Sequence, residues 1–182
     1  MTDADLARYA DTEAIKHLKA QYCRFIDTKQ WDRLAGLFAE GTRFEGFGSA
    51  PTGSDETVFV DGISTRMKDA VSVHHGHTPE IVFLGPDRAR GIWAMMDLVE
   101  LGPGVPLKEF PGGRGYCGYG HYEEEYVRTG GGWKFSFLRL TRLRLDPLAP
   151  DHPPIRHNLL AHSPDWLDGC LAGLMLLILE IY

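Results

Sequence analysis

Long segments with the features of β-strands follow one another from residue 73 to residue 145, and they constrain the fold more than any other feature. A short turn, Thr129 to Gly132, separates the last two of these segments. So short a connection can join only antiparallel neighbours, which predicts an antiparallel meander. The predicted strands are residues 73–84 (interrupted by Pro79), 89–101, 116–128 and 133–145.

The first part of the chain has the periodicity of helices. Apolar side chains recur at helical spacing over residues 12–26, which predicts an amphipathic helix. Asp27, with Gln30 three residues later, has the spacing of a capping box and predicts a second helix that ends at Gly41. A third, short helix is predicted over residues 61–71. Two short strands are also expected, at residues 42–47 and 58–60.

Helices followed by an antiparallel meander predict an α+β fold with a curved sheet that wraps a pocket. The length of 182 residues fits one domain with a full core. We assign this domain to residues 1–146, with a Pro- and Gly-rich, mobile loop at 102–115. Residues 147–182 are predicted to be an extension whose apolar end packs in the core or in an oligomer interface, because that end is too short to span a bilayer.

Composition excludes several classes of partner and site. The net charge is −6 and no long basic run occurs, so nucleic acid is not an expected partner. Cys23, Cys117 and Cys170 are widely spaced, which disfavours a disulfide framework or a finger-type zinc site and fits a reducing compartment. The N-terminus lacks the basic start and apolar run of a signal peptide, so we expect a cytoplasmic protein.

Three histidines fall close together in the segment VHHGHTPEI, residues 73–81. In a strand, His75 and His77 share one face and His74 lies on the other. The HxH spacing could bind a metal with His121 as a third ligand, but the Glu and the second His strand of a cupin site are not recognisable. The alternatives are a catalytic histidine and a histidine with a structural role. We predict at least one catalytic histidine and no metal.

Other residues could serve either a pocket or the core. Asp27 lies at a helix corner, where its carboxylate could orient an imidazole or cap the second helix. Tyr22 could face a pocket or complete the apolar face of the first helix. Asp97, in an apolar strand, needs a partner such as Arg142, in a pocket or in a structural ion pair. Trp93 and Tyr122 could contact a flat hydrophobic ligand, although aromatic residues in strands are usually core.

Taken together, four segments resemble the NTF2-like, SnoaL-like superfamily, and within it most closely the bile acid 7α-dehydratases. The segments are EAIKHLKAQYCRFIDTKQWD, HGHTPEI, GIWAMMD and GGWKFSFLRLTRLR, within residues 12–146. The resemblance implies a cone-shaped α+β barrel with three helices around a deep pocket. It also implies a homo-oligomer, from dimer to tetramer, that needs no metal or organic cofactor.

The resemblance implies a function and a set of site residues. The expected reaction is elimination of water from a hydrophobic hydroxy-ketone, such as a steroid or polyketide, by acid–base catalysis. A cyclase or isomerase of a polyketide or terpenoid and a non-catalytic binding protein are the alternatives. The implied catalytic residues are Tyr22, Asp27 and His74, and the expected substrate-binding residues are Asp97, Arg142, His77, Trp93 and Tyr122.

Overall fold

The structure is a computed structural model that describes residues 2–149, 151–153 and 167. The chain divides into two compact units, Met1–His152 and Pro153–Tyr182. The fold below is that of the first unit. The apolar end that is predicted for the extension lies outside the described residues, so the domain boundary after Asp146 stays a prediction.

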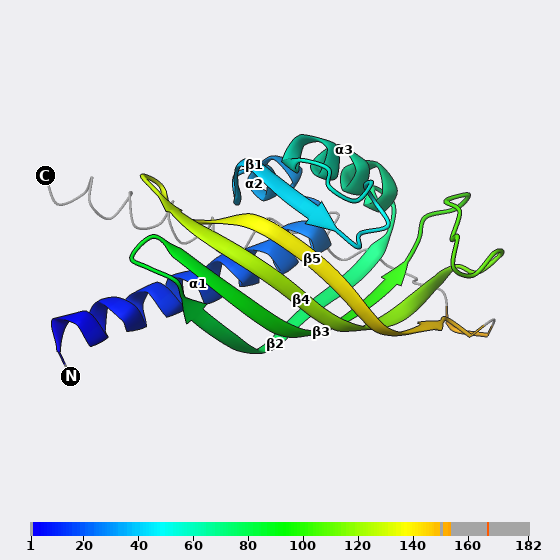
Figure 1. Cartoon of the computed structure of the whole chain (residues 1–182). Helices are drawn as coiled ribbons and strands as arrows, with labels where there is room; N and C mark the ends of the chain where they lie inside the picture. Colours follow the sequence, from blue (N-terminus) through cyan, green and yellow to red (C-terminus); the bar gives the residue numbers. More distant parts are fainter. Residues whose placement is uncertain (1, 150, 154–166, 168–182) are drawn as a thin grey trace, which may run out of the picture. The chain divides into compact units, whose positions relative to one another are not determined.

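A curved sheet of five strands, with the order β1-β5-β4-β3-β2, is the centre of the fold (Figure 1). β1 pairs with β5 in parallel, and all other neighbours are antiparallel. Among the described residues β1 and β2 are the free edges, so the sheet is open. The predicted α+β fold with a mostly antiparallel sheet is confirmed. The strands are β1 Phe38–Glu45, β2 Val71–Phe83, β3 Arg88–Glu100, β4 Gly115–Thr129 and β5 Gly132–Pro147.

Three helices accompany the sheet: α1 Asp3–Asp27, α2 Trp31–Ala35 and α3 Glu56–Met67. α1 packs against β2 and β5, and α3 packs against β1. The predicted second helix is present, but its bounds are wrong, because α2 has only five residues and Phe38 already begins β1.

The third helix begins earlier than predicted, so the expected strand at residues 58–60 is also wrong. Asp55 is the N-cap of α3, and its side chain accepts a hydrogen bond of 3.0 Å from the backbone N–H of Val58. Phe59, Ile63 and Met67 then recur every four residues and form the buried face. This period belongs to a helix and not to a strand.

The end of α1 explains why Asp27 does not cap the second helix. The N–H of Gln30 bonds to the carbonyl of Phe25 at 2.8 Å, and the N–H of Lys29 bonds to that of Ile26 at 3.2 Å. These two bonds, with Lys29 at φ 61°, form a Schellman motif. The N-cap of α2 is Gln30, which makes no capping side-chain bond. The capping-box prediction is therefore wrong, and the Asp27 carboxylate is available for other contacts.

Aromatic rings fill the core between α1, α3 and the sheet. Phe44 stacks on Phe59 with ring centroids 3.9 Å apart, and Phe38 meets both rings edge-on. Tyr22 from α1 packs against Phe135 of β5 at 5.6 Å. Such ring pairs add stability beyond the area that they bury. Tyr22 belongs both to this core and to the wall of the cavity described below.

No helix within the described part of the chain is long and apolar enough to cross a membrane. Cytoplasmic location and homo-oligomerisation stay predictions.

Candidate active site

A cavity of about 260 Å³ lies between the concave face of the sheet, α1, α3 and the loop after β1. It joins residues that are far apart in the sequence, because the register of the strands brings their inward side chains together. Of the eight predicted site residues, the cavity wall includes Tyr22, His74, Asp97, Tyr122 and Arg142. Asp27 lies directly behind this wall, bonded to His74.

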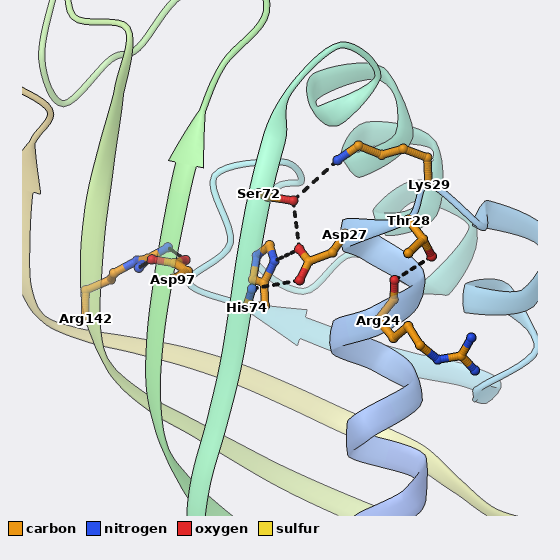
Figure 2. A network of polar contacts seen from close by, with 8 residues as sticks. All are labelled: Arg24, Asp27, Thr28, Lys29, Ser72, His74, Asp97 and Arg142. Carbon is orange, nitrogen blue, oxygen red and sulfur yellow. Dashed lines mark hydrogen bonds and ion pairs between the residues drawn. The ribbon is translucent and has the colours of Figure 1, made fainter. Parts of the chain in front are cut away.

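Asp27 and His74 form a hydrogen-bonded pair between the end of α1 and β2. Oδ1 of Asp27 lies 2.6 Å from Nδ1 of His74, and Oδ2 accepts the backbone N–H of His74 at 2.8 Å. Figure 2 shows the carboxylate facing the edge of the ring that bears Nδ1. The carboxylate thus holds both the backbone and the ring of one residue, which fixes the direction of the imidazole.

This contact determines which ring nitrogen is available for chemistry. A carboxylate can only accept, so Nδ1 of His74 carries the proton that faces Asp27. Nε2 is then unprotonated in the neutral ring, and no described residue is bonded to it. The side chain of His74 is only 8% exposed. The arrangement presents a basic nitrogen at the cavity with a carboxylate behind it, which is the orientation found in catalytic triads.

Two further residues support Asp27 from behind, and the sequence reasoning missed both. The Ser72 hydroxyl donates to Oδ1 of Asp27 at 2.8 Å, and the Lys29 ammonium donates to the Ser72 hydroxyl at 3.3 Å (Figure 2). Burial lowers the pKa of Lys29, and the charge of Asp27 partly opposes this effect. Alternation along β2 carried a signal, because Ser72 lies two residues before His74 and shares its face.

Asp97 and Arg142 form the second polar group of the cavity. Asp97 lies opposite His74 in the register of β2 and β3. Both of its oxygens accept hydrogen bonds of 2.7 Å from the Arg142 guanidinium. Burial lowers the pKa of Arg142, but the bonds and the charge of Asp97 outweigh it and raise the pKa overall. The pair predicted from the sequence therefore exists, as a bidentate contact between a buried Asp97 and a partly buried Arg142.

Gly118 makes this pair possible. It stands between the two residues, opposite Asp97 on β4, so the Arg142 side chain from β5 must cross it. A Cβ atom at this position would lie 1.8 Å from Nη1 of Arg142 and 2.2 Å from Oδ1 of Asp97. Only a residue without a side chain leaves that space open.

We expect Gly118→Ala to push the Asp97–Arg142 pair apart and to lower the free energy of unfolding by roughly 1–3 kcal/mol, as overpacking does. Urea denaturation followed by tryptophan fluorescence measures the change. Gly130→Ala is the matched control, because a Cβ there meets no atom within 4 Å. Equal denaturation midpoints for the two variants would contradict the packing argument.

Two buried phenols line the cavity beside these polar groups. Tyr22 and Tyr122 are each 1% exposed, and their rings meet edge to face at 5.9 Å. Burial raises the pKa of both hydroxyls well above the usual value, so both are neutral donors. Neither hydroxyl is bonded to another described residue. Each can therefore donate to an oxygen of a molecule in the cavity.

A family model of the SnoaL-like domain matches residues 7–139 of this chain. The chain belongs to the SnoaL-like family. A curated relative, "Probable cyclase FGR4" of Gibberella zeae, is 32% identical over 139 residues, which cover 71% of this chain and 89% of the relative.

Solved structures show the same fold as this SnoaL-like domain. Hexachlorocyclohexane dehydrochlorinase LinA-type3 from Novosphingobium barchaimii is 26% identical with a TM-score of 0.65, over 82% of this chain and 99% of that one. A candidate scytalone dehydratase from Novosphingobium aromaticivorans is 22% identical with a TM-score of 0.62, over 83% of this chain and 97% of that one. The predicted NTF2-like, SnoaL-like fold is thereby confirmed.

His77 and Trp93 do not line the cavity of this SnoaL-like domain. The strand keeps its alternation up to His77, and the register with β3 shifts only between His77 and Glu80. His77 is therefore exposed on the face away from His74, with its ring 5.4 Å from that of His75. Trp93 is buried in the core and donates to the Tyr126 hydroxyl at 2.8 Å. We leave both out of the proposed site.

The described part of the chain also contains no arrangement of side chains that would support the metal hypothesis. No group of three or more His, Cys, Asp or Glu side chains is placed to hold an ion there. His75 and His77 share a face, as alternation predicts, but they have no third ligand.

A buried ion pair behind the two phenols was not predicted from the sequence. Nζ of Lys19 lies 2.5 Å from Oε1 of Glu124, and both side chains are almost fully buried. The ammonium also lies 3.3 Å from the ring centroid of Tyr122 and 4.4 Å from that of Tyr22. A signal was present, because Lys19 falls on the apolar face of α1 between Ile15 and Tyr22. A lysine at such a position needs a buried partner.

Proposed function

We propose that the protein is a cofactor-independent hydro-lyase that eliminates water from a hydrophobic hydroxy-ketone. The Asp27–His74 pair carries this proposal, because it presents one oriented basic nitrogen to a small cavity. A histidine can take a proton at neutral pH and return it to a leaving group. By their names, a dehydrochlorinase and a candidate dehydratase with the same fold also perform eliminations.

His74 performs both proton transfers in this mechanism. Nε2 removes a proton from the carbon that the ketone acidifies, and the electron pair of that C–H bond enters the enolate. As the electrons return to form the new C=C bond, the C–O bond to the hydroxyl breaks, and the imidazolium gives its proton to the departing oxygen. Water leaves and His74 is neutral again. Asp27 stabilises the transient imidazolium.

The other polar groups of the cavity position the substrate and its charge. The phenols of Tyr22 and Tyr122 donate to the enolate oxygen or to the leaving hydroxyl. The guanidinium of Arg142, held by Asp97, offsets the negative charge that develops on the enolate. These groups are fixed before the substrate binds, so little reorganisation is needed during the reaction.

A cyclase is the second candidate function, and one observation favours it. The relative from Gibberella zeae that is 32% identical is named a cyclase. Ring closure can use the same base to form an enolate that attacks a second carbonyl. Product mass separates the two reactions. Dehydration lowers the mass of the substrate by one water, whereas the ring closure itself leaves the mass unchanged.

A direct assay uses a 7α-hydroxy-3-oxo-4-ene steroid as substrate. We expect the purified protein to convert its enone to a dienone, which shifts the absorbance to longer wavelength. Mass spectrometry of the product should show the loss of one water. A panel of β-hydroxy-ketones of smaller size extends the test. If no compound of either kind loses water, dehydration is ruled out as the activity.

A further inference from the structure

A second hollow adjoins the cavity and gives it an outlet. This groove is open to solvent and has a volume of about 670 Å³. It lies between α3 and the loop that joins β3 to β4. Gly48, Ser49 and Arg66 line both the cavity and the groove. Arg66 therefore stands where one space passes into the other.

Arg66 differs from the other arginine of the cavity in having no partner. Arg142 is bound by both oxygens of Asp97. Arg66 is half-buried, and within the described residues it makes no hydrogen bond or ion pair. A guanidinium has five N–H donors and keeps its charge at any physiological pH. A partly buried cation of this kind can still bind an anion, and its planar fork fits a carboxylate or phosphate group.

The charges around Arg66 do not already neutralise it. Lys108, on the loop side of the groove, is exposed and also makes no ion pair with a described residue. Two carboxylates share these walls, Asp61 in the groove and Glu109 in the cavity. Neither forms an ion pair with Arg66 or Lys108. The groove is therefore lined by two cations, Arg66 and Lys108, that form no ion pair with a described residue.

The cavity is small enough that a polycyclic substrate would extend out of it past Arg66. Pockets that enclose a drug-sized ligand have volumes of about 300–1,000 Å³, and the cavity holds only about 260 Å³. A polycyclic substrate with its reacting carbons at His74 would fill this cavity, and its far end would extend past Arg66 into the groove.

We propose that Arg66 binds an anionic group, such as a carboxylate, at the end of the substrate remote from the eliminated hydroxyl. Lys108 adds a second, exposed positive charge to this subsite. The orientation of the substrate rests on the proposed function, since it places the reacting end at His74. The subsite itself is a matter of binding and can be tested without turnover.

The test compares two ligands that differ in one charge. A 3-oxo-4-ene steroid with a carboxylate on its side chain and the primary amide of the same acid are titrated into the protein by calorimetry. We expect the wild-type protein to bind the acid roughly tenfold more tightly, as for a charged hydrogen bond. Arg66→Gln should reduce this ratio to about one and leave the affinity for the amide unchanged. Lys68→Gln is the control. It removes one positive charge from the same region, but Lys68 lines neither the cavity nor the groove.

Several results would overturn the subsite. They are equal affinity of the wild-type protein for acid and amide, an acid preference that survives in Arg66→Gln, loss of the preference in Lys68→Gln, and no binding of either ligand. Failure of the proposed function would look different. A protein that prefers the acid through Arg66 but never removes water retains the subsite and refutes the dehydration.

Discussion

His74→Ala is expected to lower kcat/KM for dehydration by about 10²–10⁴-fold, the usual contribution of a positioned acid–base group. The variant loses the only imidazole among the described residues that line the cavity. Proton removal from carbon and protonation of the hydroxyl would then fall to water. The initial rate of dienone formation measures the change, with circular dichroism to show that the fold is kept.

His77→Ala is the matched control for this variant, because it removes an imidazole from the same strand but from the opposite, exposed face. Its rate should equal that of the wild-type protein. Asp27→Asn separates orientation from proton transfer, since it keeps the shape of the side chain but can donate to Nδ1 of His74 and reverse the tautomer. Full activity of His74→Ala would remove histidine from the mechanism.

Lys19→Met is expected to lower the free energy of unfolding by about 3–5 kcal/mol, which is the usual cost of breaking a buried ion pair on one side. The remaining Glu124 carboxylate would be left in a site that is 3% exposed. Its second oxygen accepts the Tyr126 hydroxyl at 2.5 Å, but one neutral donor does not compensate the charge. Urea denaturation monitored by circular dichroism gives the free energy.

Two companion variants make this prediction specific. Lys16→Met removes an exposed lysine from the same helix, one that pairs with the neighbouring Glu13, and should leave the denaturation midpoint unchanged. Lys19→Met combined with Glu124→Leu removes both charges and should recover much of the loss, because an apolar pair of similar size needs no solvation. If Lys19→Met alone were as stable as the wild-type protein, water would have to reach the Lys19–Glu124 pair.

The long strands could be predicted from the sequence because each follows a local rule. Alternation and short turns locate β3, β4 and β5 to within two residues of the observed ends. The region from Asp27 to Phe38 could not be read in the same way. Asp27 with Gln30 fits a helix start, whereas the backbone bonds of the Schellman motif that end α1 there are invisible in the sequence. The parallel pairing of β1 with β5 is likewise set by packing and not by local pattern.

The sequence singled out five of the residues that line the cavity, but not how they are arranged around it. His74, Asp97 and Arg142 were singled out from charge in apolar strands and from a family resemblance. Their proximity depends on the register that sets His74 beside Asp97 and on the missing side chain of Gly118. Arg66 gave no signal at all, because an arginine on a helix is ordinary until its neighbours are known. Its role follows from the position of its neighbours in the structure and not from its residue type.

The register shift in β2 between His77 and Glu80 limits where a residue can be inserted or deleted. Before it, even-numbered residues such as His74 face inward, and after it odd-numbered residues such as Ile81 do, because β2 spends three steps from His77 to Glu80 where β3 spends two. Thr78, at φ 39°, lies in the extra step. A deletion or insertion of one residue there would reverse one half of the strand and leave the other in place. The number of residues between His74 and Ile81 is therefore itself under constraint, whatever their identity.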